Sequence, residues 1–341
     1  MGRRPSGSRL DRIQKTTNYT DGVFQNVEPT VVMAKEASFF KLLREFNNKP
    51  QDVSPVHPLP HIKTALKALT SEKPAIVWFG HSSYLIRSRN FTVLVDPVLS
   101  NNASPVRFFG KAFQGTSVYG ADDFPDIDLL LITHDHYDHL DYKTVLKFKH
   151  KVKHVVCSLG VGAHLEYWGF KPETITELNW WEHHQPDSDI KLTATPARHF
   201  TGRGVKRGKT LWSSFVLNIH GYQLFLGGDS GYDAQFKKIG EQFGPFDLAF
   251  LECGQYGKYW PNIHMFPEET VQAARDLNAA IVFPVHWAKF ALSNHTWNEP
   301  IKRFIAEAGK KNQNYISPLI GQTYVLGDVF EQKEWWNHLQ P

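Results

Sequence analysis

The chain has 341 residues, with 38 Lys or Arg, 34 Asp or Glu, 17 His and only 2 Cys. A hydrophobic content of 41% excludes a disordered chain, and 2 Cys exclude a disulfide framework or a Cys-rich zinc site. A formal charge of +4 is too small to indicate a nucleic-acid partner. The high number of histidines raises the question of whether several of them converge on one site.

The sequence contains no stretch close to the roughly 18 apolar residues of a membrane-spanning helix. Its basic start is followed by no apolar run, so it does not resemble a secretory signal. The low cysteine content is typical of a reducing compartment. We therefore expect a cytoplasmic protein, either entirely soluble or in peripheral contact with a membrane.

The beginning of the chain differs in composition from the rest. Residues 1–30 are polar, which predicts poor order. Residues 35–47 have apolar side chains at helical spacing, which predicts one amphipathic helix that either packs on the core or contacts lipid. A proline-rich linker follows. The sequence thus predicts an N-terminal extension over residues 1–60 and a catalytic domain over residues 61–341.

Beyond residue 60, short apolar segments alternate with amphipathic ones. Strands are predicted over residues 75–79, 84–87, 91–95, 127–132, 154–158, 174–177, 189–194, 213–219, 223–226 and 279–285. Helices are predicted from residue 142, after residue 158, and over residues 267–277 and 300–308. Groups of strands with helices between them indicate a layered α/β protein.

The strongest motif directly follows the apolar segment 127–132. It has the spacing His-x-His-x-Asp-His and consists of His134, His136, Asp138 and His139. A strand that ends in a tight loop can point such side chains to one place, and imidazole with carboxylate is a donor set for zinc, iron or manganese. The alternative is a His-rich surface loop, which explains the motif poorly because a turn needs no such donors.

Three more donors follow apolar segments elsewhere in the chain. They are His199, Asp229 and His286. Any one of them alone would more often be structural. It is less probable that all three follow strands of a buried type by coincidence. In addition, the donors of one loop cannot complete two coordination spheres. These residues are therefore candidates for the remaining ligands.

This set of donors, in this order, resembles the metallo-β-lactamase superfamily over residues 75–300. Within it, the chain is most similar to the N-acylphosphatidylethanolamine-hydrolysing phospholipase D group and its bacterial relatives. The segments that carry this closer similarity are Trp78–Ser83, Pro196–Phe200, Lys209–Phe215, Gly228–Tyr232, His264–Glu269 and His286–Leu292. The chain departs from that group at Glu252 and Cys253, where small apolar residues are expected.

The resemblance implies a four-layer αβ/βα sandwich with a metal site at one edge, between two sheets. It also implies two zinc ions, with iron or manganese as alternatives. The implied ligands of one ion are His134, His136 and His199. Those of the second ion are Asp138, His139 and His286, with Asp229 bridging both.

Four residues are candidates for roles beside the metal. Asp138 is expected to orient the attacking water in addition to binding metal. His264 either contacts a phosphate, donates a proton or is a surface histidine. His81 is expected to lie behind the ligands and to hold the loops of the site. Asp96 either bonds a ligand imidazole or is an ordinary turn aspartate.

The predicted function is metal-dependent hydrolysis by a metal-bridging hydroxide, and the favoured substrate is a phosphodiester of the N-acylphosphatidylethanolamine type. The alternative is a lactonase or a sugar-phosphate hydrolase on the same dinuclear site. A non-catalytic metal-binding protein is disfavoured by the complete ligand set. The expected partner is a small-molecule or phospholipid substrate and no nucleic acid, and a homodimer stays open.

Overall fold

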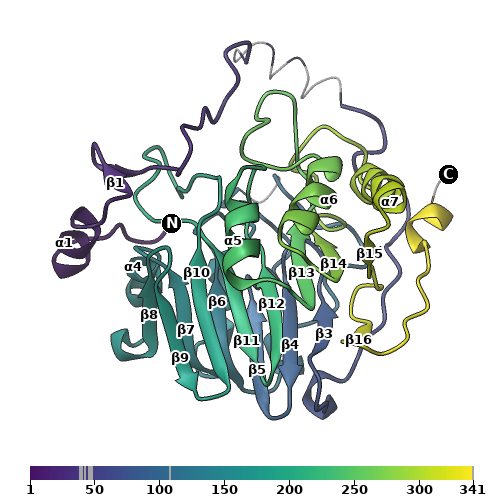
Figure 1. Ribbon diagram of the computed structural model, residues 1–341, viewed down its shortest axis with the longest axis horizontal. Helices are drawn as coiled ribbons and strands as arrows, with labels where there is room; N and C mark the ends of the chain where they lie inside the picture. Colours follow the sequence, from purple (N-terminus) through teal and green to yellow (C-terminus); the bar gives the residue numbers. More distant parts are fainter. Residues whose placement is uncertain (38–40, 42–43, 45–48, 107–108, 340–341) are drawn as a thin grey trace.

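The structure is a computed structural model that describes residues 1–37, 41, 44, 49–106 and 109–339. Within these residues, two sheets of seven strands each form the centre of the molecule (Figure 1). The strand order is β16-β3-β4-β5-β6-β7-β8 in the first sheet and β15-β14-β13-β12-β11-β10-β9 in the second. The amphipathic helix predicted over residues 35–47 lies largely outside the described residues.

All the predicted strands are present, and their bounds differ from the predicted ones by at most two residues. The first sheet consists of β3 (Ala75–Trp78), β4 (Tyr84–Ser88), β5 (Phe91–Val95), β6 (Ile127–Ile132), β7 (Val152–Ser158), β8 (Ile175–Leu178) and β16 (Thr323–Val325). The second consists of β9 (His183–Asp187), β10 (Ile190–Thr195), β11 (Ser214–Ile219), β12 (Tyr222–Leu226), β13 (Leu248–Glu252), β14 (Ile281–Val285) and β15 (Asn314–Tyr315).

The helices are mostly short. The α-helices are α1 (Ser8–Gln14), α3 (Tyr142–Phe148), α4 (Gly162–Tyr167), α5 (Gln235–Phe243), α6 (Pro267–Asp276) and α7 (Glu299–Lys311). The 3-10 helices are Leu66–Ala68, Ala121–Asp123, Pro172–Thr174 and Trp335–Leu339. Among the residues that the structure describes, no helix has both the length and the apolar character needed to cross a membrane.

The direction of the strands brings several loops to one edge of each sheet. In the first sheet, β5 to β8 pair in parallel, and β3 runs the same way because β3 and β5 are both antiparallel to β4. In the second sheet, β12 to β15 pair in parallel, and β10 runs the same way because β10 and β12 are both antiparallel to β11. The carboxyl ends of these strands are where open α/β sheets bind ligands.

The two sheets pack face to face, and helices cover their outer faces. Along β3, Ile76 and Trp78 belong to the core between the sheets, whereas Val77 belongs to the core under α3 and α4. Tyr84 of β4 stacks on Phe250 of β13 across the interface, with ring centres 4.0 Å apart. The helices α5, α6 and α7 lie against the second sheet (Figure 1). This order of helix, sheet, sheet and helix confirms the predicted four-layer sandwich.

The prediction that residues 1–30 are poorly ordered is wrong. These residues form α1 and a hairpin of β1 (Tyr19–Thr20) and β2 (Val23–Phe24), and they bury Ile13 and Phe24. The small core that receives both side chains contains Leu159, Trp180, Ala197, Leu211 and Trp212. Composition was misleading because contacts with distant residues hold this polar segment: Ile13 and Phe24 are buried, and Arg9 pairs with Glu166 and Glu177.

Phe250→Ala is expected to lower the free energy of unfolding by about 3–5 kcal/mol, because Phe250 is fully buried between the sheets and the substitution leaves a cavity. Urea denaturation measures the change. The control is Val205→Ala, at a position that is 99% exposed, which should change the stability by less than about 0.5 kcal/mol. Equal stability of the two variants would contradict the packing of the two sheets described above.

Candidate metal centre

The candidate site lies where carboxyl ends of strands from both sheets meet. The loop after β6 brings His134, His136, Asp138 and His139. The second sheet brings His199 after β10, Asp229 after β12 and His286 after β14. A Cβ atom at Gly228 would lie 2.7 Å from the carbonyl oxygen of Ser213, so glycine is required where the chain reaches the site from β12. The fold thus brings together all seven donors expected from the sequence.

Four donors form the first group: His134, His136, His199 and Asp229. Nδ1 of His136 lies 3.0 Å from Nε2 of His134 and 3.2 Å from Nε2 of His199. Oδ2 of Asp229 lies 3.7 Å from each of those two Nε2 atoms. A tetrahedral ion with bonds of about 2.0–2.1 Å has ligand atoms about 3.3 Å apart, so the group fits a zinc ion.

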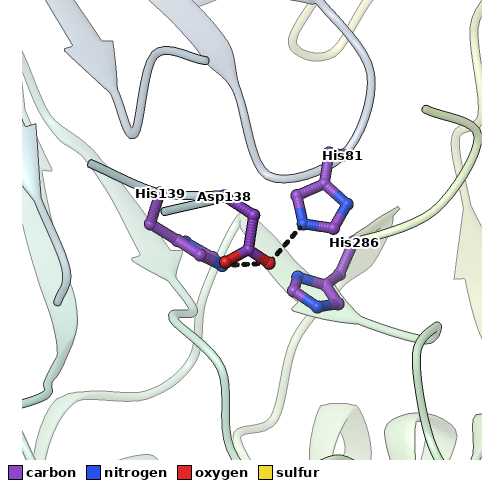
Figure 2. Close-up of side chains that lie close together, drawn as sticks. All are labelled: His81, Asp138, His139 and His286. Carbon is purple, nitrogen blue, oxygen red and sulfur yellow. Dashed lines mark hydrogen bonds and ion pairs between the residues drawn. The ribbon is translucent and has the colours of Figure 1, made fainter. Parts of the chain in front are cut away.

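Figure 2 shows the second group: His81, Asp138, His139 and His286. Oδ2 of Asp138 lies 3.0 Å from Nε2 of His81 and 3.8 Å from Nε2 of His139. The rings of His81 and His286 are 4.0 Å apart. Sequence reasoning placed His81 behind the ligands, whereas the structure places its ring nitrogen among the donor atoms of this group.

Asp229 lies between the two groups. Its Oδ2 faces the first group, and its Oδ1 lies 3.0 Å from Nε2 of His139 and 2.9 Å from Nδ1 of His286. Oδ1 of Asp229 and Nε2 of His139 are both buried. Although they lie 3.0 Å apart, they do not form a hydrogen bond with each other, and neither has another hydrogen-bond partner among the described residues. Buried polar atoms nearly always have a partner, so these two atoms are well suited to coordinate an ion.

Burial and neighbouring charges set the protonation of the donors. Burial lowers the pKa of three imidazoles of the first group: His134, His136 and His199. Burial also opposes the charged form of His139, but the carboxylates of Asp229 and Asp138 outweigh it and raise the pKa of His139. Against the effect of burial, His139 and His286 hold the pKa of Asp229 well below its usual value. The three imidazoles of the first group are thus neutral and Asp229 is ionised, which are the forms that bind a metal, whereas His139 would have to release a proton to bind one.

Asp96 fixes the orientation of His139. Its Oδ2 accepts hydrogen bonds from Nδ1 of His139 at 2.8 Å and from Oγ1 of Thr133 at 2.6 Å. Its Oδ1 accepts from the backbone nitrogen of Thr133 at 2.8 Å. Because Nδ1 of His139 is engaged in this way, Nε2 is the nitrogen that would bind an ion. Asp96 is therefore a bonding partner of a candidate ligand in this structure.

No sequence motif pointed to Asn26, which holds the backbone of His199. Nδ2 of Asn26 donates to the carbonyl oxygen of His199 at 2.9 Å, and Oδ1 accepts from the backbone nitrogen of His199 at 3.0 Å. Nδ1 of His199 is held in turn by the carbonyl oxygen of Ile263 at 2.8 Å. A single asparagine in a polar segment has no local pattern from which this contact could be inferred.

Arg203 supports the loop that carries His134 to His139, and sequence reasoning missed it as well. Its Nη1 donates to the carbonyl oxygens of Asp135 at 2.8 Å and of Leu140 at 2.7 Å. Its guanidinium lies 4.0 Å from the centre of the Tyr137 ring. These contacts tie together the backbone at Asp135 and at Leu140, the two ends of the loop.

His264 lies beside both groups without belonging to either. Its ring is 5.0 Å from the ring of His199 and 5.2 Å from that of His286. Its Nδ1 lies 2.7 Å from Oε2 of Glu252, which is buried at the end of β13. Burial and the charge of Asp229 raise the pKa of Glu252, and burial lowers the pKa of His264. Glu252, His264, Asp229 and His286 form a third cluster of donors within 4.8 Å of one another.

Asp96→Asn is expected to lower the affinity for divalent metal by about 10–100-fold. The carboxylate faces only donors, so an amide nitrogen in its place would face at least one donor that it cannot accept from. Competition with a chromogenic chelator measures the affinity. Asp126→Asn, at an exposed position, is the control and should leave the affinity unchanged. Equal affinities of the two variants would show that Asp96 does not orient a ligand.

Asn26→Ala is expected to weaken metal binding about 10-fold, because it removes both hydrogen bonds that hold the backbone of His199. The same chelator competition measures the change. The neighbouring exposed residue provides the control, Gln25→Ala, which should bind metal like the unmodified protein. If Asn26→Ala kept the full affinity, the first residues of the chain would have no role in the site.

Comparison with known proteins identifies the family. The Beta-lactamase superfamily domain matches residues 91–287, which is more than half of the chain. The chain is 35% identical to an uncharacterised protein of Mycobacterium tuberculosis over 328 residues, 95% of this chain and 88% of the relative. It is 28% identical to N-acyl-phosphatidylethanolamine-hydrolyzing phospholipase D 1 of Caenorhabditis elegans over 269 residues, 74% of this chain and 75% of the relative.

A solved structure shows the same fold. Igni18, a metallo hydrolase from the archaeon Ignicoccus hospitalis, superposes with a TM-score of 0.57 at 20% identity, over 76% of this chain and 100% of that one. The family match, the relatives and the fold agree with one another. The protein is therefore a metal-dependent hydrolase of the metallo-β-lactamase superfamily.

Proposed function

We propose that this hydrolase is a phosphodiesterase with two zinc ions, or iron or manganese in their place. Its proposed substrate is an N-acylphosphatidylethanolamine or a related phosphodiester. The observation that carries the proposal is the position of Asp229, whose two oxygens face two separate groups of donors. A carboxylate in that position suits a pair of ions that share one ligand.

In this proposal, every donor has a stated task. One ion is held by His134, His136 and His199, the second by Asp138, His139 and His286, and both by Asp229. When bound, the pair would supply hydroxide near neutral pH and stabilise charge on a phosphoryl oxygen. The remaining tasks belong to side chains: Asp138 orients the attacking water, His81 holds Asp138 at 3.0 Å, and His264 gives a proton to the leaving oxygen.

A separate cavity of about 720 Å³, whose wall contains none of the proposed metal ligands, offers a place for the acyl chain of such a substrate. Part of its wall is the segment between β13 and α6, which also carries His264. The aromatic residues of the wall are Tyr256, Tyr259, Trp260 and Phe266, and the basic ones are Lys41, Arg44 and Lys258. Aromatic rings suit an acyl chain, and basic groups suit the negative charge of a phosphodiester. The similarity to a worm phospholipase D of this specificity supports the same substrate class.

The test measures two activities and the metal content. We expect the purified protein to cleave bis(p-nitrophenyl) phosphate and to release N-acylethanolamine from N-acylphosphatidylethanolamine in vesicles. His136→Ala should lose both activities by more than about 100-fold and also lose bound metal, because one donor of the first group is gone. The exposed histidine at position 57 provides the control: His57→Ala should keep both activities and the bound metal.

The outcomes separate the candidate functions. Unchanged turnover in His136→Ala would overturn the metal-dependent mechanism. Cleavage of the aryl diester without release of N-acylethanolamine would leave a phosphodiesterase with another substrate. Cleavage of a lactone or of a sugar phosphate, but of no diester, would replace the proposal by the corresponding hydrolase.

A further inference from the structure

The pair of Glu252 and His264 lies beside the two metal groups, and no ion in the proposed function requires it. We propose that Glu252 is a positioning residue, which holds His264 so that Nε2 gives its proton to the leaving oxygen of the substrate. The substrate class that depends on this step is an ester of an aliphatic alcohol. The inference rests on the proposed phosphodiesterase function and deepens it.

Glu252 is held rigidly at the end of β13. Its side chain is 1% exposed, and its Oε1 accepts hydrogen bonds from the backbone nitrogens of Ser230 at 2.8 Å and Met265 at 3.2 Å. Its carbonyl oxygen accepts from Oγ1 of Thr270 at 2.7 Å. The two backbone donors on Oε1 fix the orientation of the carboxyl group. Its other oxygen, Oε2, lies 2.7 Å from Nδ1 of His264.

His264 is more exposed than the two histidine rings that it contacts. Its side chain is 13% exposed, whereas the side chains of His199 and His286 are each 1% exposed. The two nitrogens of an imidazole point in different directions, and Glu252 forms its hydrogen bond with Nδ1. Nε2 is therefore the nitrogen available to a substrate, and its position is set by the contact on the other edge.

The distance between the two residues favours a shared hydrogen over a shared ion. Nδ1 of His264 and Oε2 of Glu252 are 2.7 Å apart, which is the length of a strong hydrogen bond. Two ligands of one tetrahedral ion would be about 3.3 Å apart. The pair is thus closer together than the donor atoms of the two metal groups, for which the distances given above run from 2.9 to 3.8 Å.

This pair can supply a proton without leaving a charged imidazole behind. Hydroxide forms a new bond to phosphorus, and the bond from phosphorus to the leaving oxygen breaks with its electron pair on that oxygen. The step starts with a neutral His264 that carries a proton on Nε2 and shares a second hydrogen between Nδ1 and Oε2 of Glu252. The leaving oxygen takes the proton from Nε2, the shared hydrogen moves fully to Nδ1, and Glu252 is left as a carboxylate. Water then returns the lost proton.

The nature of the leaving group decides how much this proton matters. An alkoxide is strongly basic and is a poor leaving group until it is protonated. A p-nitrophenolate spreads its negative charge over the ring and leaves without a proton. The pair is therefore useful to an enzyme whose natural substrate releases an aliphatic alcohol, such as an N-acylethanolamine.

The experiment compares Glu252→Gln and His264→Ala on ethyl aryl phosphates whose leaving phenols range from p-nitrophenol to phenol. An amide at position 252 can donate a hydrogen bond to Nδ1 but cannot give up its proton, so a neutral imidazole would have to become an imidazolate to donate from Nε2. We expect kcat/KM to fall by about 100-fold for the phenol ester and by less than about 3-fold for the p-nitrophenol ester. The control is Glu173→Gln, at an exposed position, with no change along the series.

Two further measurements test the role of Glu252 without any lipid substrate. The metal content of Glu252→Gln should equal that of the unmodified protein. A lower metal content would mean that Glu252 is a metal ligand and would overturn the proposal. The proton NMR spectrum should show a downfield signal from the hydrogen between Nδ1 of His264 and Oε2 of Glu252, which both variants lose and Glu173→Gln keeps. Absence of this signal from the unmodified protein, or an equal loss of rate for every leaving group, would also overturn it. Failure to cleave N-acylphosphatidylethanolamine would overturn the proposed lipid substrate and leave these readouts intact.

Discussion

The strand ends hold six imidazoles and two carboxylates within two small groups, and most of these side chains are buried. Burial of so many polar groups costs free energy unless each one has a partner. A divalent ion is a partner for four of them at once. The carboxylate of Asp229 is central, because each of its oxygens faces a different group. Metal binding and the stability of this edge of the fold are therefore coupled.

The supporting contacts explain why the donors keep the spacing of an ion. Asp96 engages one nitrogen of His139 and leaves the other to the site, and Ile263 does the same for His199. The strands add rigidity, because each donor follows directly or closely after a strand buried in the sandwich. Glu252 makes the same kind of contact with Nδ1 of His264, a more exposed ring. In the proposed mechanism, such contacts therefore serve both metal binding and proton transfer.

Local patterns were sufficient for most of the fold. Each predicted strand is a short apolar segment, and burial on both faces makes such segments recognisable. The strand β9 (His183–Asp187) was not predicted because its side chains are polar and largely exposed, and pairing with β10 is what makes it a strand. The first residues of the chain were misjudged for a related reason. Their order comes from contacts with distant residues, which their own composition does not reveal.

The sequence by itself determined the donors of the loop after β6, because their spacing is local. It pointed to His199, Asp229 and His286 because each follows an apolar segment, and the family resemblance then assigned them to the two ions. Only the tertiary structure decided which donors share a group, that His81 lies among them, and that Asn26 and Glu252 hold His199 and His264. The physical reason is distance along the chain. Spacing and hydrophobicity are properties of neighbouring residues, whereas a contact such as that of Asn26 with His199 exists only after two sheets and the N-terminal segment have packed together.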